Sequence, residues 1–328
     1  MKIAYYLPEA VFSNSEFEAL GWPAEKIFKK TGIKNRHVTG ENEFALDLAV
    51  KACERLFKEA AVDKPEVDFL LYCTQSPDYL IPTNACILHE KLGLKKSAGA
   101  LDINLGCSGF LYGLSLAKGL LLSGQARSVL LVTADTYTKY INKKDKTNRV
   151  IFGDAAAATY LDKADALKIG DFVFGTDGSG AENLCVKTGG LRHRKTELTA
   201  LEKKDKSGNV RSEDNLFMDG PEILSFTLVS VPKAVQEILT RAGLRLEDID
   251  YFLFHQANAF ILESLREKLG IPPEKFPIDM EDIGNTVSCT IPILLNHLHR
   301  DKKIKPGQRI LLAAFGVGYS WIATLLNA

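Results

Sequence analysis

The chain has 328 residues, of which 46% are hydrophobic and 25% charged, as in a soluble globular protein with one large domain or two similar ones. Its 41 acidic residues balance 41 basic residues, so the net charge favours neither a nucleic acid nor a membrane surface as a partner. The N-terminal stretch is broken by Pro8 too soon for a signal peptide, and no apolar run reaches the roughly 18 residues of a membrane span. We therefore expect a cytoplasmic protein.

The first regular pattern along the chain is an amphipathic helix, a charged turn and an apolar strand at residues 51–74. The same pattern recurs at residues 233–256, and a gapless shift of 182 residues pairs Asp68 with Asp250. Such an internal repeat predicts two halves of similar fold, each with a mixed sheet covered by helices. The two halves are expected at residues 1–165 and 166–328.

The central stretch of the sequence combines a strand, a sharp turn and a helix. Residues 98–105 read as a short apolar strand, and an apolar helix of about four turns starts at Ser108. Cys107 then lies at a helix N-terminus, where the helix dipole favours the thiolate and free amides can hold an oxyanion. The alternative is a small buried core residue. The six cysteines are scattered without a Cys-x-x-Cys pair, which argues against a zinc site and a disulfide framework.

Further apolar strands and one long polar segment complete the pattern. Residues 186–215 carry eight basic side chains and few large apolar ones. We interpret this segment as a solvated surface excursion, and the alternative is a flexible cap over an active site. The remaining strands are expected at Val67–Cys73, Ser128–Thr133, Ala155–Leu161, Lys168–Phe174, Ile249–His255, Arg309–Phe315 and Trp321–Leu326.

Three polar or glycine-rich turns stand out in the second half. His255 ends a buried strand, where sheet proteins place binding and catalytic groups, although a core histidine would fit there too. Asn285 follows a glycine and precedes a helix, so it is either a site residue or a helix cap. The loop at 315–321 looks like a phosphate-binding glycine loop, but it lacks the third glycine and the following helix.

Taken together, three motifs resemble the β-ketoacyl-acyl-carrier-protein synthase III family of the thiolase-like superfamily. They are Gly106-Cys107-Ser108-Gly109-Phe110, His255-Gln256-Ala257-Asn258 and Gly284-Asn285-Thr286. Supporting matches at residues 30–33, 152–157, 177–180 and 218–222 follow the family order, so the resemblance covers nearly the whole chain. It implies an α/β thiolase-like fold in which two similar halves form five α-β-α-β-α layers.

The resemblance also implies a Cys-His-Asn site. Cys107 would carry the acyl group of a thioester, and His255 and Asn285 would stabilise the enolate formed when a malonyl-type extender on acyl-carrier protein loses carbon dioxide. The carbanion would then attack acyl-Cys107. The backbone amides of Cys107 and Val317 would hold the oxyanion, and position 317 is usually glycine in the family. Phosphopantetheine thioesters would be substrates, with no metal and no further cofactor.

Other positions depart from the family pattern and suggest a specialised synthase. Lys26 stands where a tryptophan commonly stacks on the adenine of coenzyme A, and Lys146 replaces the arginine that faces it. Arg36 is retained and could meet a phosphate. We expect acyl-carrier protein to be the better donor, unless Trp22 takes over the stacking. Ile81 replaces a phenylalanine that reaches into the partner subunit's acyl pocket.

The resemblance further implies a homodimer in which the strand at Ser128–Thr133 pairs across the twofold axis. Gln256 and Asn258, assigned to the carrier-binding part of the site, are expected to position the His255 loop. Two alternatives to condensation stay open. One is transfer of the acyl group from Cys107 to an amine or hydroxyl, and the other is a non-catalytic partner subunit.

Overall fold

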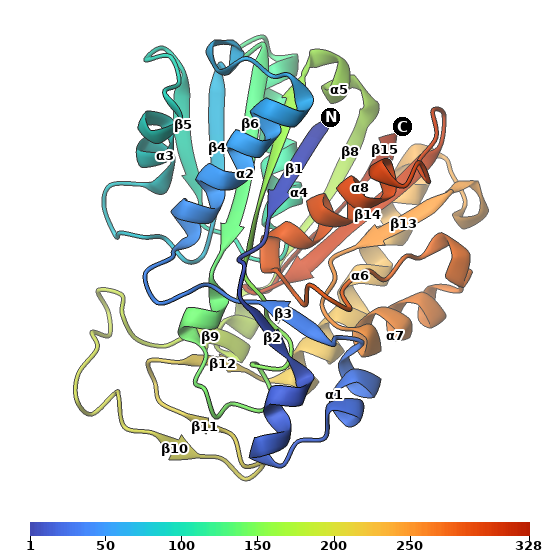
Figure 1. The fold of residues 1–328 in the computed structure, drawn as a ribbon. Helices are drawn as coiled ribbons and strands as arrows, with labels where there is room; N and C mark the ends of the chain where they lie inside the picture. The colour runs from blue at the N-terminus through green and yellow to red at the C-terminus, as the bar shows by residue number, and fades with distance from the viewer.

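The computed structural model describes residues 1–328, apart from the side chain of Leu20, and contains two main sheets with helices between and outside them (Figure 1). The first sheet has the order β1-β7-β6-β4-β5, with β1 at Lys2–Tyr6, β7 at Ala155–Asp162, β6 at Ser128–Asp135, β4 at Phe69–Cys73 and β5 at Gly99–Ile103. The second sheet has the order β13-β14-β15-β8, with β13 at Tyr251–Phe254, β14 at Arg309–Gly316, β15 at Ser320–Asn327 and β8 at Ile169–Thr176. All eight strands expected from the sequence are present.

The helices form three layers around these sheets. The outer face of the first sheet packs on α2 (Ala45–Ala60) and α3 (Asn84–Leu92). Between the sheets lie α4 (Gly109–Leu122) and α8 (Thr290–Arg300), whose apolar residues share one core with both sheets. The outer face of the second sheet packs on α6 (Gly220–Ala242) and α7 (Ala259–Leu269). This arrangement confirms the five α-β-α-β-α layers.

The central helix α4 can lie close to the first sheet because it carries a glycine at the contact. A Cβ atom on Gly113 would lie 2.5 Å from Leu131 Cδ1 of β6, a separation that real side chains do not adopt. Phe110, Leu111 and Leu114 are buried on the same helix. Since α4 starts two residues after Cys107, this packing holds the turn that carries Cys107 between the two sheets.

The internal repeat appears as two copies of one unit. In the first copy, α2 leads through the short helix η2 (Lys64–Glu66) into β4, and in the second, α6 leads through η5 (Leu246–Asp248) into β13. The carboxylates paired by the repeat make equivalent hydrogen bonds. Asp68 accepts from the backbone N–H of Arg127 at 2.9 Å, and Asp250 accepts from that of Arg309 at 2.8 Å. The first main sheet uses residues 2–162 and the second 169–327, and α5 (Lys163–Lys168) connects them.

Strand β6 corrects the expected dimer contact. It pairs with β4 on one side and β7 on the other, and all its residues are buried. A strand with both edges paired has no free N–H or C=O groups for a second subunit. The expectation that Ser128–Thr133 pairs across a twofold axis is therefore wrong. The edge strands of this sheet are β1 and β5.

Helix α6 is long and apolar enough, by length and composition alone, to cross a membrane. In this fold it packs on α7, β8, β14 and β15, and its apolar face, including Ile223, Phe226 and Val235, belongs to the core of the second half. Its apolar character is thus explained by the packing of the second half.

The charged segment begins and ends on a two-stranded ribbon, in which β9 (Leu184–Val186) pairs with β12 (Leu216–Met218). Within it, β10 (Lys203–Lys204) and β11 (Val210–Arg211) form a hairpin. Figure 1 shows this ribbon and hairpin at the same end of the molecule as α1 (Ala24–Thr31) and the small sheet of β2 (Val11–Ser13) and β3 (Asn35–His37). The segment is therefore anchored at both of its ends.

Candidate active site

A cavity of about 970 Å³ collects the three candidate catalytic side chains from both halves of the chain. Cys107 comes from the turn between β5 and α4, His255 follows β13, and Asn285 lies in the loop before α8. All three line the cavity and all are buried. The fold thus brings together residues that lie 148 and 30 positions apart in the sequence.

The burial of Cys107 has a large effect on the pKa of its thiol. Burial raises the pKa of the Cys107 thiol to about 12, and the nearby Asp135 carboxylate adds to the rise, although the residue's own backbone amide opposes it. Burial and the helix terminus therefore act on the thiol in opposite directions, and the expectation that the helix N-terminus favours the thiolate stays a prediction.

The backbone amides expected to hold an oxyanion, those of Cys107 and Val317, lie where a glycine lets two loops touch. A Cβ atom on Gly316 would lie 2.7 Å from Cys107 Cβ and 3.0 Å from its Sγ, so only glycine allows this approach. The approach brings the following amide, that of Val317, beside the nucleophile. Among the described residues, neither the Cys107 nor the Val317 amide donates a hydrogen bond to another residue. Both are therefore free to hold an oxyanion.

His255 is held as a neutral imidazole. Burial lowers the pKa of His255 to about 3, so the ring carries one proton at ordinary pH. Its Nδ1 lies 2.8 Å from the hydroxyl of Thr290, and its ring meets Phe315 edge-on. A neutral imidazole donates from one nitrogen only, so the bond to Thr290 decides which nitrogen that is. Sequence reasoning missed Thr290, because its place in the first turn of α8 gives no signal of this contact.

Asn285 lies in the cavity wall and does not cap α8, whose N-cap residue is Cys289, so the alternative of a helix cap is wrong. Its Oδ1 accepts from the backbone N–H of Val287 at 2.9 Å, in a turn that precedes the helix. Its Nδ2 donates to the carbonyl of Ala257 at 3.2 Å. These two bonds fix the orientation of the amide and leave one N–H of Nδ2 for a ligand in the cavity.

Gln256 and Asn258 hold the His255 loop in place. Gln256 donates from Nε2 to the carbonyl of Phe254 and accepts from the backbone N–H of Asp279, both at 2.8 Å. Asn258 accepts from the N–H of Ile261 at 2.9 Å and so caps α7, at the edge of the cavity. The side-chain hydrogen bonds of Gln256 are satisfied within the protein, which leaves it to orient the loop.

The mouth of the cavity is basic and contains an aromatic ring that is already covered. Lys26, Lys146 and Trp22 all line it. The Trp22 ring stacks on Phe17 with centroids 5.3 Å apart, and the Lys146 ammonium lies 4.9 Å from the Trp22 centroid. Trp22 therefore lines the mouth as the alternative required, but its ring is engaged by these two side chains.

Arg36 is not at the mouth, which corrects its expected role. It is fully buried and donates through Nε and Nη2 to the carbonyl of Val150 and through Nη1 to that of Lys34. Burial lowers the pKa of its guanidinium to about 10. Because its donors are used internally and it lines neither cavity, Arg36 supports the loops and does not meet a phosphate.

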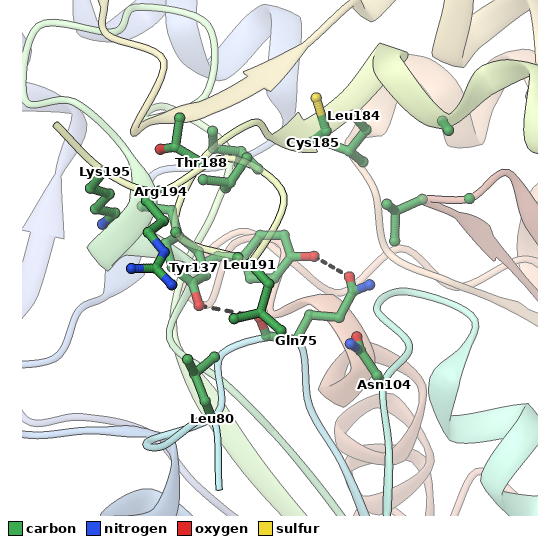
Figure 2. Close-up of a pocket in the computed structure, with 18 residues that line it drawn as sticks. Gln75, Leu80, Asn104, Tyr137, Leu184, Cys185, Thr188, Leu191, Arg194 and Lys195 are labelled. Atoms are coloured by element: carbon green, nitrogen blue, oxygen red, sulfur yellow. Dashed lines mark hydrogen bonds between the residues drawn. The ribbon is translucent and has the colours of Figure 1, made fainter. Parts of the chain in front are cut away.

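A second cavity of about 940 Å³ lies beside the first (Figure 2). Leu184 lines both cavities, and Val317 lines the second. Val317 Cγ1 lies 2.9 Å from where a Cβ on Gly106 would be, so this side chain packs against the residue before Cys107. Leu80 also lines the second cavity, while the neighbouring Ile81 is 86% exposed. Position 317 thus shapes the second cavity rather than the oxyanion site.

The charged excursion at residues 186–215 forms part of the wall of both cavities. Thr188, Leu191 and Arg194 line the second, while Asp205 and Arg211 line the first. The exposed side chains of residues 189–198 agree with a solvated surface excursion, and the segment also borders both cavities, as the alternative of a cap over the site requires. The sequence shows its polarity but not that its two ends pair and fold it back over the site.

The comparisons with known proteins agree with this geometry. A 3-oxoacyl-[acyl-carrier-protein] synthase III model matches residues 101–178, and a model of the C-terminal part of that synthase matches residues 239–328. The β-ketoacyl-[acyl-carrier-protein] synthase III of Caldanaerobacter subterraneus subsp. tengcongensis is 35% identical over 98% of this chain and 95% of its own length. The chain belongs to this synthase III family. The corresponding protein of Deinococcus deserti is 34% identical over 97% of this chain and 87% of its own length.

Solved structures of synthase III proteins share the fold. A crystal structure of a 3-oxoacyl-(acyl-carrier-protein) synthase III has a TM-score of 0.96 and 50% identity, covering 99% of this chain and 98% of its own. The synthase III of Thermus thermophilus has a TM-score of 0.85 and 33% identity, with the same coverages. The priming β-ketosynthase of the R1128 polyketide pathway has a TM-score of 0.85 and 28% identity over 99% of this chain and 94% of its own. The thiolase-like fold is therefore established for this chain.

Proposed function

We propose that this chain is a β-ketoacyl-acyl-carrier-protein synthase that joins an acyl group on Cys107 to a malonyl-type extender with loss of carbon dioxide. The observation that carries the proposal is the meeting of Cys107, His255 and Asn285 in one cavity. A thiol nucleophile and two neutral hydrogen-bond donors suit thioester exchange followed by enolate formation. The second cavity, which shares Leu184 with the first, offers the acyl group a separate place to lie.

In the first half-reaction, Cys107 exchanges with the thioester. The sulfur attacks the acyl carbonyl, the amides of Cys107 and Val317 hold the oxyanion, and the carrier thiol leaves with the proton that the Cys107 thiol gives up. Since the thiol starts protonated with a pKa of about 12, this proton has to move during the attack. The acyl group then stays on Sγ.

In the second half-reaction, the malonyl carboxylate leaves as carbon dioxide and the thioester oxygen becomes an enolate. Asn285 Nδ2–H and His255 Nε2–H donate to that oxygen. We assign the His255 proton to Nε2, which requires the Thr290 hydroxyl to donate to Nδ1, 2.8 Å away, rather than to the carbonyl of Val287 at 3.3 Å. The enolate carbon attacks the acyl carbonyl, the carbon–sulfur bond to Cys107 breaks, and the thiolate takes a proton from solvent. The chemistry needs no metal or further cofactor.

For the donor, the mouth of the cavity favours acyl-carrier protein over coenzyme A. With Trp22 stacked on Phe17 and covered by the Lys146 ammonium, a free ring face for adenine is missing in this conformation. A stacked base contributes about 1–3 kcal/mol. The basic mouth can still attract the phosphate of a pantetheine arm. Together with Lys26 and Val317, these departures support a role in a specialised pathway.

For assembly, we propose a homodimer that uses the free edge of β5. Leu101 on this strand is 48% exposed, and the large apolar side chains of Tyr79, Leu80 and Ile81 are exposed on the loop after β4. An open apolar edge next to exposed apolar side chains suits a twofold interface. Ile81 would then reach the partner subunit's acyl cavity. All six cysteines are free, which supports a reducing, cytoplasmic location.

The function is tested by product analysis with carrier-protein substrates. Acyl- and malonyl-acyl-carrier protein should give one 3-oxoacyl-carrier protein and one carbon dioxide per turnover, and Cys107→Ala should form no 3-oxoacyl product. Transfer of the acyl group to an amine or hydroxyl acceptor without carbon dioxide would contradict condensation. Absence of any product, with a folded protein, would favour the non-catalytic subunit.

A further inference from the structure

The second cavity carries polar groups where an acyl chamber would ordinarily be apolar, and they lie next to the nucleophile. A Cβ atom placed on Gly106, the residue before Cys107, would lie 2.5 Å from Gln75 Oε1 and 3.2 Å from the Tyr137 hydroxyl. Both side chains line the cavity. Figure 2 shows Gln75 and Asn104 on one side of this pocket and Arg194 and Lys195 on the other. Cys107 lines the first cavity only, so an acyl group reaches Gln75 and Tyr137 by passing Gly106.

These two side chains have a defined hydrogen-bonding pattern. The Tyr137 hydroxyl donates to Gln75 Oε1, and Tyr140 donates to the Gln75 backbone carbonyl at 3.2 Å (Figure 2). Tyr137 is buried, and burial raises the pKa of its phenol well above the ordinary value, so it stays protonated. Its oxygen keeps lone pairs that can accept. Among the described residues, Gln75 Nε2 donates to no other group. The pair thus offers one acceptor and one donor to a ligand.

A hydroxyl group on the acyl chain fits this pattern, because it donates and accepts at once. It can donate to the Tyr137 oxygen and accept from Gln75 Nε2–H. A plain alkyl chain would cover the Gln75 N–H without replacing its lost water, which is costly for a buried donor. Val317 Cγ1 narrows the cavity beside Gly106, because it lies 2.9 Å from the Cβ position on that residue. The polar contact is therefore made near the thioester carbonyl.

The outer part of the cavity supplies an apolar lining. Leu184, Leu216 and Val186 lie there, so the chamber accepts carbon chain beyond the polar contact. Arg194 and Lys195 are exposed on the excursion and form no ion pair among the described residues. They lie across the pocket from Gln75 in Figure 2. A carboxylate-tipped acyl group is the competing possibility that these two cations raise, and the test below includes it.

We propose that the acyl group carried by Cys107 bears a hydroxyl near its thioester carbonyl, held between Gln75 and Tyr137. The proposal rests on the proposed condensing function and names the substrate class of that same site. It makes Gln75 and Tyr137 specificity-determining residues, which select the primer without taking part in bond making.

The test compares three donors of similar length on acyl-carrier protein: 3-hydroxybutanoyl, butanoyl and succinyl. Their rates of Cys107 acylation are measured by mass spectrometry of the intact protein, and condensation with malonyl-acyl-carrier protein follows. The hydroxyacyl donor should exceed butanoyl about 10- to 100-fold in kcat/KM. Equal use of butanoyl, or a preference for succinyl, would overturn the substrate class while leaving the condensation proven. No adduct and no product with any donor would overturn the proposed function as well.

Variants assign the preference to the two side chains. Gln75→Leu and Tyr137→Phe should each remove most of the preference by slowing the hydroxyacyl donor, while butanoyl is used as well as before or better. Tyr160→Phe removes a phenol hydroxyl from β7, outside both cavities, and should keep the full preference. Retention of the preference in both pocket variants, with the proteins folded by circular dichroism, would refute the assignment.

Discussion

Substitutions of Asn285 should affect condensation and folding stability separately. Its Nδ2 is proposed to donate to the enolate, whereas its Oδ1 accepts from the backbone N–H of Val287. Asn285→Ala removes one of the two enolate donors, so condensation should slow by about 10²–10³, or about 2.7–4 kcal/mol of transition-state stabilisation. It also leaves the buried N–H of Val287 without its acceptor, which costs about 1–3 kcal/mol of folding stability. Acylation of Cys107 should continue, because its oxyanion amides are untouched.

Asn285→Asp provides the matched variant. Its carboxylate can still accept from the Val287 N–H, so it should lose less folding stability than Asn285→Ala, yet it has no N–H for the enolate and should condense as slowly or more slowly. Acylation is followed by intact mass, condensation by single turnover of the preloaded acyl enzyme, and stability by urea unfolding. If both variants condense at the parent rate, Asn285 only supports the turn before α8 and the enolate assignment fails.

Three further results are expected. Condensation by the preloaded enzyme should be flat between about pH 5 and 8, because His255, with its pKa lowered to about 3, protonates only below that range; a fall centred near pH 6.5 would show a solvated imidazole instead. Thr290→Val should slow condensation about tenfold or more while Thr290→Ser restores it, in single-turnover assays that also show unchanged acylation of Cys107. Leu101→Asp on the free edge of β5 should convert a dimer into a monomer in sedimentation velocity, and an unchanged dimer would place the interface elsewhere.

The fold was accessible from the sequence for identifiable reasons, and the three residues predicted to be catalytic meet in one cavity. Apolar runs bounded by glycine and charged turns gave every strand of the two main sheets except β1, and the repeat that pairs Asp68 with Asp250 gave the two halves. Cys107, His255 and Asn285 each stand at the end of such a strand or turn. Patterns of this kind can be read from the sequence because the spacing of apolar residues within one segment indicates whether it forms a strand or a helix.

The predictions that the structure corrects concern contacts between segments that lie far apart in the sequence. Arginine side chains are mostly exposed, and no local pattern around Arg36 predicts otherwise. In the structure Arg36 is buried and donates hydrogen bonds to the carbonyls of Val150 and Lys34. The neighbours of β6 are a property of the sheet, so its apolar sequence fits an edge as well as a centre. The burial of Cys107, which raises the pKa of its thiol, depends on how completely the site is closed to water, and the helix position alone does not reveal it.

The central claim is that Cys107 carries an acyl group which a decarboxylated extender then removes, and intact mass spectrometry tests it most directly. The protein is loaded with an acyl-carrier-protein thioester, and malonyl-acyl-carrier protein is added in a second step. We expect one acyl adduct, mapped to Cys107, that disappears in step with the formation of 3-oxoacyl-carrier protein and carbon dioxide. An adduct on another cysteine, or one on Cys107 that persists while the extender loses carbon dioxide, would contradict the account.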